Sequence, residues 1–234
     1  MATIDALRGP TLMPASGKPA TSIVVLLHGY GSNGDDLIGL APFFARELPD
    51  TAFYSPNAPH LLEGGFMGGY QWFGLAGYDP AAMMRDPKYL ADAFRALRPG
   101  TEAAATVLNK YLDQVLEHHT LDAGRLALLG FSQGTMMALH VGLRREKQIG
   151  GILGYSGALT GSDRLAAEIK SKPPVALVHG DADPVVPFGA MGEAEKALAS
   201  VGVKYESHCV RGLQHGIDGE GAQFGAAFLK KAIG

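Results

Sequence analysis

The sequence has little cysteine, no excess of one charge and no long apolar runs. Cys209 is the single cysteine among 234 residues, so no disulfide forms within the chain. The 20 basic and 23 acidic side chains give a net charge of -3 and are scattered, which disfavours binding to nucleic acid. Apolar runs such as Ile23 to Leu27 fall far short of the roughly 20 residues that cross a bilayer. The first residues do not resemble a signal peptide, so we expect a cytoplasmic protein without a membrane span.

What the chain does have is enough apolar sequence for one sizeable core, because 47% of its residues are hydrophobic. We find no internal repeat, low-complexity block or Ser/Pro-rich linker, so we expect a single domain over residues 1–234. The Gly-rich stretch from Asn57 to Asp79 is long for a connection, and long loops in compact domains are usually functional. We therefore expect a pocket loop or cap at about residues 57–100.

Short apolar runs alternate with longer stretches of helical spacing, and most of the runs end in Gly, Pro, Asn or Asp. This order predicts a mostly parallel sheet with helices on both faces and a ligand site at the carboxyl ends of its strands. The expected strands are Ser22–Leu27, Thr51–Ser55, Arg125–Leu129, Ile149–Tyr155, Pro174–His179 and Val203–Val210. The expected helices are Asp35–Leu48, Thr101–His119 with Thr101 as N-cap, Gln133–Arg145, Asp163–Lys170, Phe188–Val201 and Asp218–Lys231.

A G-x-S-x-G pattern, Gly130 to Gly134, lies between the apolar run RLALL and a helical pattern. In that context it is typical of a nucleophile elbow, a tight strand-to-helix turn that points a serine out of the sheet. Ser132 is therefore the candidate nucleophile. A serine hydroxyl needs a nearby base, and the base needs a third group that fixes its tautomer.

Four histidines follow Ser132 and are candidates for the base. His140 lies on the buried stripe of a helix, His179 at a strand end suits a structural role, and His208 is expected to be solvated. His215 lies after the last expected strand and before the last helix, where a base belongs. It is our candidate.

The acid is expected between Ser132 and His215, after a strand, and the segment VALVHGDADPVVP offers Asp181 and Asp183. We favour Asp183, because Pro184 restricts its backbone to extended conformations and gives the carboxylate a rigid mount. Asp181 fits the role of a turn residue.

The anion of an acyl-transfer intermediate needs backbone N–H donors. One candidate is the N–H of Gln133, which directly follows the nucleophile at a helix start. The other is the N–H of Tyr30 in the glycine-rich segment LLHGYGSNGDD, after the first expected strand. This segment lacks the G-K-[ST] ending of a phosphate-binding P-loop.

With these pieces in this order, the chain resembles the phospholipase/carboxylesterase family of α/β hydrolases, which includes acyl-protein thioesterases and small bacterial carboxylesterases. The resemblance covers most of the chain and rests on HGYGSNGDD, SPNAP, QWF, GFSQG, HGDADPVVP and GLQHGI. It implies an α/β-hydrolase fold with helices on both faces of a mostly parallel sheet. It also implies the nucleophile at Ser132, the acid at Asp183, the base at His215 and the oxyanion donors at Tyr30 and Gln133.

We therefore expect a serine carboxylesterase that hydrolyses short- to medium-chain esters through an acyl-enzyme, with a small-molecule ester as its partner and no cofactor. Lysophospholipase or acyl thioesterase activity, and a non-catalytic binding module of the same fold, remain alternatives. Tyr30 stands where acyl-protein thioesterases usually have Leu, and Gly74 where they have Asp, which argues against a thioesterase acting on lipidated proteins. The oligomeric state stays open, with a homodimer as one option.

Apolar residues of the 57–100 region are the candidates for an acyl pocket, foremost Trp72, Phe73 and Leu75. The aromatic Phe66, Tyr70 and Tyr78 are further candidates, while Met83, Met84, Tyr89, Leu90 and Phe94 either cover the pocket or belong to a plain helical connection.

Two other chemistries are disfavoured. A metal site built from His28, His179, Asp181, Asp183 and His215 lacks the spacing of known metal motifs, so we expect no metal. Cys209 as nucleophile is disfavoured because we expect it to be a buried packing residue on the face of the last strand that carries Tyr205.

Overall fold

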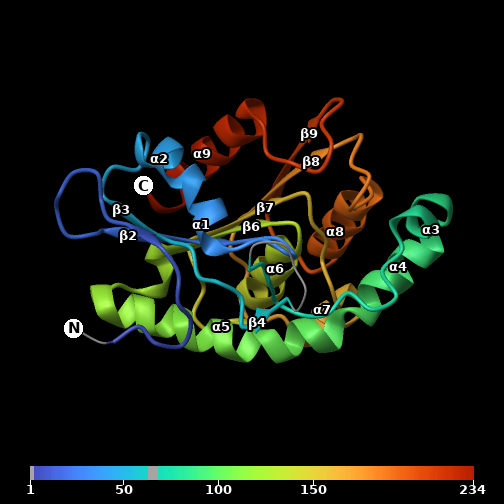
Figure 1. The fold of residues 1–234 in the computed structure, drawn as a ribbon, viewed down its shortest axis with the longest axis horizontal. Coiled ribbons are helices and arrows are strands. Elements are labelled where there is room, and N and C mark those ends of the chain that lie inside the picture. The colour runs from blue at the N-terminus through green and yellow to red at the C-terminus, as the bar shows by residue number, and fades with distance from the viewer. Residues whose placement is uncertain (1–2, 63–67) are drawn as a thin grey trace.

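The computed structural model describes residues 3–62 and 68–234. Its centre is a seven-stranded sheet in the order β1-β3-β2-β6-β7-β8-β9, in which every neighbouring pair is parallel except β1 with β3 (Figure 1). The strands of this sheet are β1 (Thr11–Leu12), β2 (Ser22–Leu27), β3 (Thr51–Tyr54), β6 (Leu126–Phe131), β7 (Gly151–Tyr155), β8 (Val175–Gly180) and β9 (Tyr205–Val210). A separate two-stranded hairpin pairs β4 (His60–Leu61) with β5 (Tyr70–Gln71).

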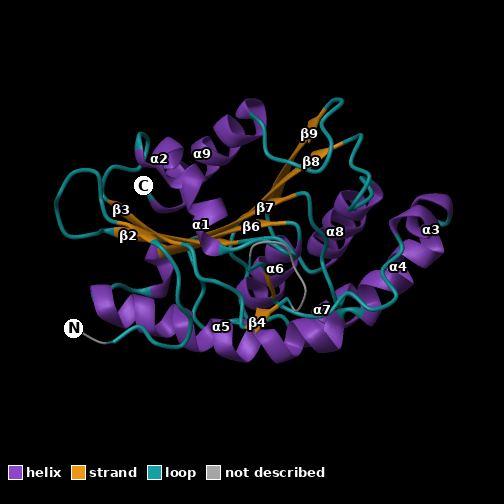
Figure 2. Cartoon of the chain, viewed as in Figure 1, coloured by secondary structure: helices purple, strands orange, loops and turns teal. Residues whose placement is uncertain are grey.

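Helices cover both faces of the sheet (Figure 2). The helices are α1 (Gly34–Leu37), α2 (Ala41–Ala45), α3 (Pro80–Arg85), α4 (Pro87–Ala96), α5 (Arg98–His119), α6 (Gln133–Arg144), α7 (Leu165–Glu168), α8 (Gly189–Ser200) and α9 (Gly219–Ile233). Side chains of successive strand residues point to opposite faces, and β2 shows the result. Ile23, Val25 and Leu27 belong to the core layer that also contains residues of α5, α6 and α8, while Val24 and Leu26 belong to the layer that contains residues of α1, α2 and α9. The expected fold class, a mostly parallel sheet covered on both faces, is confirmed.

The helices differ from expectation where glycine or proline interrupts them. The expected helix Asp35–Leu48 is broken into α1, a 3-10 turn and α2, because Gly39 is a weak helix former and Pro42 lacks the N–H that would continue the first helix. Helix α5 begins at Arg98, so Thr101 is not its N-cap. Pro99 fits the first turn, where a missing N–H costs no bond, and the Thr101 hydroxyl donates to the Leu97 carbonyl.

The region between Tyr78 and Gly100 forms two helices, α3 and α4, that project beyond α8 at one end of the molecule (Figure 1). Each begins with an aspartate cap followed by proline. Asp79 accepts from the Ala82 N–H and Asp86 from the Lys88 N–H. The carboxyl terminus lies at the opposite end of the molecule, beside the start of the sheet (Figure 1).

Strand β9 is an edge strand, and most of its residues are exposed. Cys209 is exposed, so the expectation of a buried cysteine is wrong. The reason is its position on the sheet edge, where the outward face with Tyr205 stays open to solvent. His208 lies on the other face, against Phe224 of α9, and its ring makes a hydrogen bond with the Glu220 carboxylate.

Candidate active site

Ser132 lies between the end of β6 and the start of α6. Its backbone has φ 56° and ψ -117°, a region that residues other than glycine rarely adopt, and its N–H donates to the Tyr155 carbonyl. The neighbouring Gly130 and Gly134 have no room for a side chain. A Cβ on Gly134 would lie 1.8 Å from the Leu27 carbonyl oxygen, and one on Gly130 2.4 Å from Gly134. The structure therefore contains the tight strand-to-helix turn that the G-x-S-x-G pattern predicts.

Asp183 and His215 come from loops that follow neighbouring strands, β8 and β9. Asp183 Oδ2 lies 2.8 Å from His215 Nδ1. Asp183 Oδ1 accepts from the N–H groups of Val185 and Val186, at 2.8 and 2.9 Å. Burial by itself raises the pKa of the Asp183 carboxyl, but the hydrogen bonds from His179, His215 and the Val185 N–H hold that pKa well below its usual range. The carboxylate is thus ionised and fixed.

The ring of His215 lies beside the elbow, because its centroid is 4.8 Å from that of Phe131, the residue before Ser132. The Ser132 hydroxyl makes no hydrogen bond to any residue that the structure describes. Such bonds are often long without a substrate and tighten when one binds. The geometry brings Asp183 and His215 together and places His215 next to the turn that carries Ser132.

The loop after β2 brings a peptide N–H close to Ser132. A Cβ on Gly29 would lie 3.3 Å from Ser132 Cβ, so the Gly29–Tyr30 peptide borders the serine. His28 is buried, which lowers its pKa, and its Nε2 accepts from the Ala58 N–H. The ring hydrogen is therefore on Nδ1, which donates to the Gly29 carbonyl at 2.7 Å. In a trans peptide the N–H points opposite to the carbonyl, so this bond fixes the direction of the Tyr30 N–H.

Gln133 contributes more than the backbone N–H that its position after Ser132 suggested. Its Oε1 accepts from the Trp72 N–H at 2.8 Å, and its Nε2 donates to the Phe73 carbonyl at 2.7 Å. The Trp72 indole N–H in turn donates to the His28 carbonyl. These buried bonds join the loop after β2, the elbow and the segment before α3 into one unit. Among the described residues, no group accepts from the N–H of Tyr30 or Gln133, so both remain available to an anion.

The candidate pocket residues lie around this unit. Trp72 is fully buried and Phe73 is 3% exposed, so both pack inside the protein, while Leu75 is partly exposed. Phe66 lies outside the described residues. Near Asp183, between α3, α4 and the start of α8, is a cavity of about 340 Å³, and its apolar lining includes Met83, Met84, Leu90, Pro187 and Phe188.

The remaining histidine and aspartate candidates lie in surroundings that suit a structural role. His140 is 3% exposed within α6, and burial lowers its pKa to about 4. Asp181 accepts from the Gly212 N–H and so joins two loops. His208 is partly covered rather than fully solvated. His179 is buried beside Asp183, a contact that the spacing H-x-x-x-D at a strand end could have indicated.

Within residues 3–62 and 68–234, no three His, Cys, Asp or Glu side chains form a group that could hold a metal ion. None of the helices in those ranges combines the length and the apolar character that a bilayer span requires.

Comparison with known proteins gives the same picture. The sequence profile of the phospholipase/carboxylesterase family matches residues 12–233. Acyl-protein thioesterase 1 of Emericella nidulans is 30% identical, with 90% of each chain covered. Esterase YpfH of Escherichia coli is 25% identical, with 92% of this chain and 85% of that protein covered. The crystal structure of esterase PE8 superposes with a TM-score of 0.86 at 41% identity, covering 97% of this chain and 99% of the other. The chain therefore belongs to the phospholipase/carboxylesterase family of α/β hydrolases and is a hydrolase of the esterase or acyl-protein thioesterase type.

Proposed function

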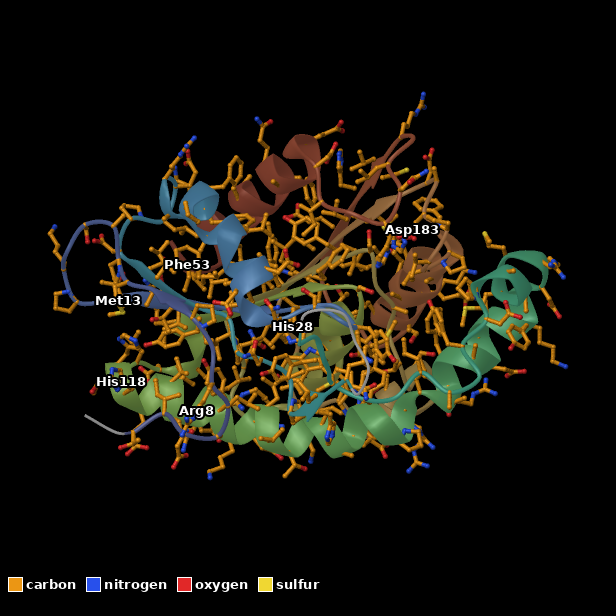
Figure 3. The ribbon with its side chains drawn as sticks, in the orientation of Figure 1. Arg8, Met13, His28, Phe53, His118 and Asp183 are labelled. Atoms are coloured by element: carbon orange, nitrogen blue, oxygen red, sulfur yellow. The ribbon has the colours of Figure 1, made fainter. Side chains whose placement is uncertain are left out.

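We propose that this protein is a serine carboxylesterase that hydrolyses short- to medium-chain carboxylic esters through an acyl-enzyme on Ser132. The observation that carries the proposal is the 2.8 Å hydrogen bond between Asp183 and His215, beside the strained backbone of Ser132. Figure 3 shows Asp183 beyond the ends of the strands, on the side of the sheet from which α8 begins. This is where enzymes of such folds carry their active sites.

In this mechanism His215 Nε2 takes the proton of the Ser132 hydroxyl as its oxygen attacks the ester carbonyl. The same proton then passes to the leaving alkoxide, and water, activated by His215, releases the acid. Asp183 remains ionised throughout, keeps the His215 hydrogen on Nδ1 and stabilises the imidazolium. The hydrogen bond at Nδ1 and the low pKa of the Asp183 carboxyl support these roles.

The N–H groups of Tyr30 and Gln133 bind the oxyanion of the tetrahedral intermediate. Two observations support this role: the His28 bond fixes the Tyr30 N–H, and the side chain of Gln133 is held at both ends of its amide. Donors that are fixed before the reaction need no reorganisation when the charge develops, and each contributes roughly 3 to 4 kcal/mol.

The cavity near Asp183 supports a preference for apolar acyl groups. Its walls carry methionine, leucine and phenylalanine, and the charged residues that border it, Asp181, Asp183 and Glu193, are all acidic. An alkyl chain that extends from Ser132 into this cavity would contact Met83 and Leu90, whereas an anionic acyl group would meet repulsion. We expect esters of neutral acids to be hydrolysed faster than esters of dicarboxylic half-acids.

The test is hydrolysis of p-nitrophenyl acetate, butyrate and octanoate by the wild type and by Ser132→Ala, with a chelator present. We expect turnover by the wild type and a loss of at least 10³-fold in the variant, because removing a nucleophile leaves only the contribution of binding and the oxyanion hole, on the order of 10³ over water. A variant that keeps a tenth of the wild-type rate excludes Ser132 as nucleophile. A fluorophosphonate that fails to label folded wild-type protein favours the binding module.

Acyl thioesterase activity is the second candidate, and the relative from Emericella nidulans named acyl-protein thioesterase 1 favours it. The same residues cleave a thioester, because the acyl-enzyme is identical and only the leaving group differs. Butyryl esters and butyryl thioesters of one chain length separate the two. A kcat/KM at least tenfold higher for the thioester assigns the enzyme to that class.

A further inference from the structure

His179 is a buried histidine that the proposed mechanism does not use, and it lies against the acid. It belongs to β8 and is 2% exposed. Its Nε2 lies 2.9 Å from the Val186 carbonyl oxygen and 3.3 Å from Asp183 Oδ2. A backbone carbonyl only accepts hydrogen bonds, so Nε2 carries a hydrogen. The N–H is directed mainly at Val186, and the carboxylate oxygen is its second neighbour.

The Asp183 carboxylate has protein groups at both of its oxygens. Oδ1 accepts from the N–H groups of Val185 and Val186, and Oδ2 faces the two imidazoles of His215 and His179. His179 therefore acts on the carboxylate in two ways. It contacts Oδ2 directly, and through the Val186 carbonyl it holds the turn whose N–H groups bind Oδ1.

The position of His179 makes it a rigid support. Strand β8 is paired with β7 on one side and β9 on the other, and the rings of His179 and Phe188 form a T-shaped pair with centroids 5.9 Å apart. Asp183 and His215, in contrast, lie on loops. His179, on the sheet, thus fixes the positions of Asp183 and His215, which lie on loops, as functional sites with precise geometry require.

We propose that His179 is a positioning residue, whose Nε2–H holds the turn from Asp183 to Val186 and orients the carboxylate so that Oδ2 faces His215. This inference rests on the proposed function, because it assigns the orientation a catalytic consequence. A carboxylate that rotates loses its contact with His215 Nδ1, and His215 then loses the orientation in which its Nε2 accepts the serine proton.

The test compares wild type, His179→Leu and His179→Gln with p-nitrophenyl butyrate. Leucine removes the N–H, and we expect kcat to fall about 10- to 100-fold while KM stays within about twofold, because an orientation error of this kind affects the transition state. The glutamine amide nitrogen reaches the position of Nε2, so we expect His179→Gln to recover at least a third of the wild-type kcat. His140→Leu is the matched control, since it also removes a buried histidine, and we expect its kcat to be unchanged.

A measurement on the unaltered protein decides the question if His179→Leu does not fold. Nitrogen-15 NMR of the histidine rings reports which nitrogen carries hydrogen, and we expect Nε2–H for His179 and Nδ1–H for His215. A His179 ring with its hydrogen only on Nδ1 overturns the proposal. So does a folded His179→Leu enzyme with the kcat of the wild type, or a His179→Gln enzyme as slow as His179→Leu.

These outcomes differ from a failure of the proposed function. If the wild type is inactive on esters and thioesters, or Ser132→Ala is fully active, the serine mechanism is wrong and the inference falls with it. If Ser132→Ala is inactive while all three histidine variants match the wild type, the serine mechanism stands and only the role of His179 is refuted.

Discussion

Asp183 is the side chain on which most of the proposed active site depends. It accepts hydrogen bonds from two backbone N–H groups and lies against the imidazoles of His179 and His215. Its low pKa follows from these donors, which outweigh the cost of burying the carboxylate. In the proposed mechanism, this charge is the reason why a carboxylate, rather than an amide of the same shape, is needed at this position.

Replacing Asp183 with Asn tests that requirement. The amide keeps the volume but loses the charge, and its NH₂ group favours the His215 tautomer with hydrogen on Nε2, which cannot accept the serine proton. We expect kcat on p-nitrophenyl butyrate to fall about 10⁴-fold, with the melting temperature as a control for folding. A well-folded variant within tenfold of the wild type contradicts the role of Asp183.

At this scale the sequence predicts which residues come after strands, but not the contacts between side chains of distant loops. Ser132, Asp183 and His215 follow from the order of motifs along the chain, and the structure brings Asp183 and His215 into contact. The bonds from Gln133 to Trp72 and Phe73 span about sixty residues and leave no periodic signal. The strand-end position of His179 predicts a structural role, and its distance to Asp183 comes only from the structure.

Among the elements, α6 shows how an active-site helix is anchored. It is buried from Gln133 to Leu143, so its first residues cannot shift without moving the core. His140 lies on this helix, and its Nδ1 has no hydrogen-bond partner among the described residues. Burial, together with the nearby Arg144 and Arg98, lowers its pKa to about 4, and Glu168 acts in the opposite direction.

The pKa of His140 predicts how stability depends on pH. Above about pH 6.5, its ordinary value, the ring is neutral in both the folded and the unfolded chain. As the pH falls from 6.5 to 4, the unfolded chain binds a proton that the folded chain does not, so the free energy of unfolding decreases. We expect the melting temperature to drop more between pH 7 and pH 4.5 in the wild type than in His140→Leu. Equal drops refute the assignment.

The boundaries of helices and strands can be predicted where the apolar periodicity runs to the end of the element. They cannot be predicted where capping residues determine the end. Helix α9, which begins at Gly219 with Asp218 as its N-cap, and the ends of β2 match the expectation closely. Helices α3 and α4 carry few buried residues, and their signal is the pair of Asp-Pro steps at residues 79–80 and 86–87. Strand β1 is two residues long and pairs only at the sheet edge, too short for any alternation to appear.

At the scale of the whole molecule, contacts at two places join the region from Tyr78 to Gly100 to the rest of the protein. A Cβ on Gly100 would lie 2.7 Å from Phe73 Cβ, so the end of the region contacts Phe73, whose carbonyl accepts a hydrogen bond from Gln133 Nε2. The Tyr78 hydroxyl donates to the Val185 carbonyl, next to the turn of Asp183. The region is thus attached to both the elbow and the acid loop.

These attachments predict that residues 1–234 unfold as one unit. Trp72 is the single tryptophan of the chain and is buried at the junction of the elbow and the cap region. Its fluorescence reports on that junction, whereas far-ultraviolet circular dichroism reports on all helices and strands. We expect the two urea-unfolding curves to coincide. A fluorescence transition at lower urea shows a cap that opens separately from the sheet.

The overall architecture was the most predictable level, because alternating strands and helices permit few arrangements. Strands β2, β3, β6, β7 and β8 are apolar on both faces, and nearly all of their residues are buried. The position of the projecting helices was not predictable, because it depends on contacts of α4 with α5 and α8 rather than on the pattern of α4 itself.

The carboxyl terminus and helices α3 and α4 lie at opposite ends of the molecule (Figure 1). If the protein is coupled to a resin or electrode through an extension after Gly234, helices α3 and α4 and the cavity beside them therefore face the bulk solution. We expect enzyme immobilised in this orientation to keep the access of substrate to the proposed active site, whereas random coupling through surface lysines, such as Lys88 on α4, turns part of the population toward the support.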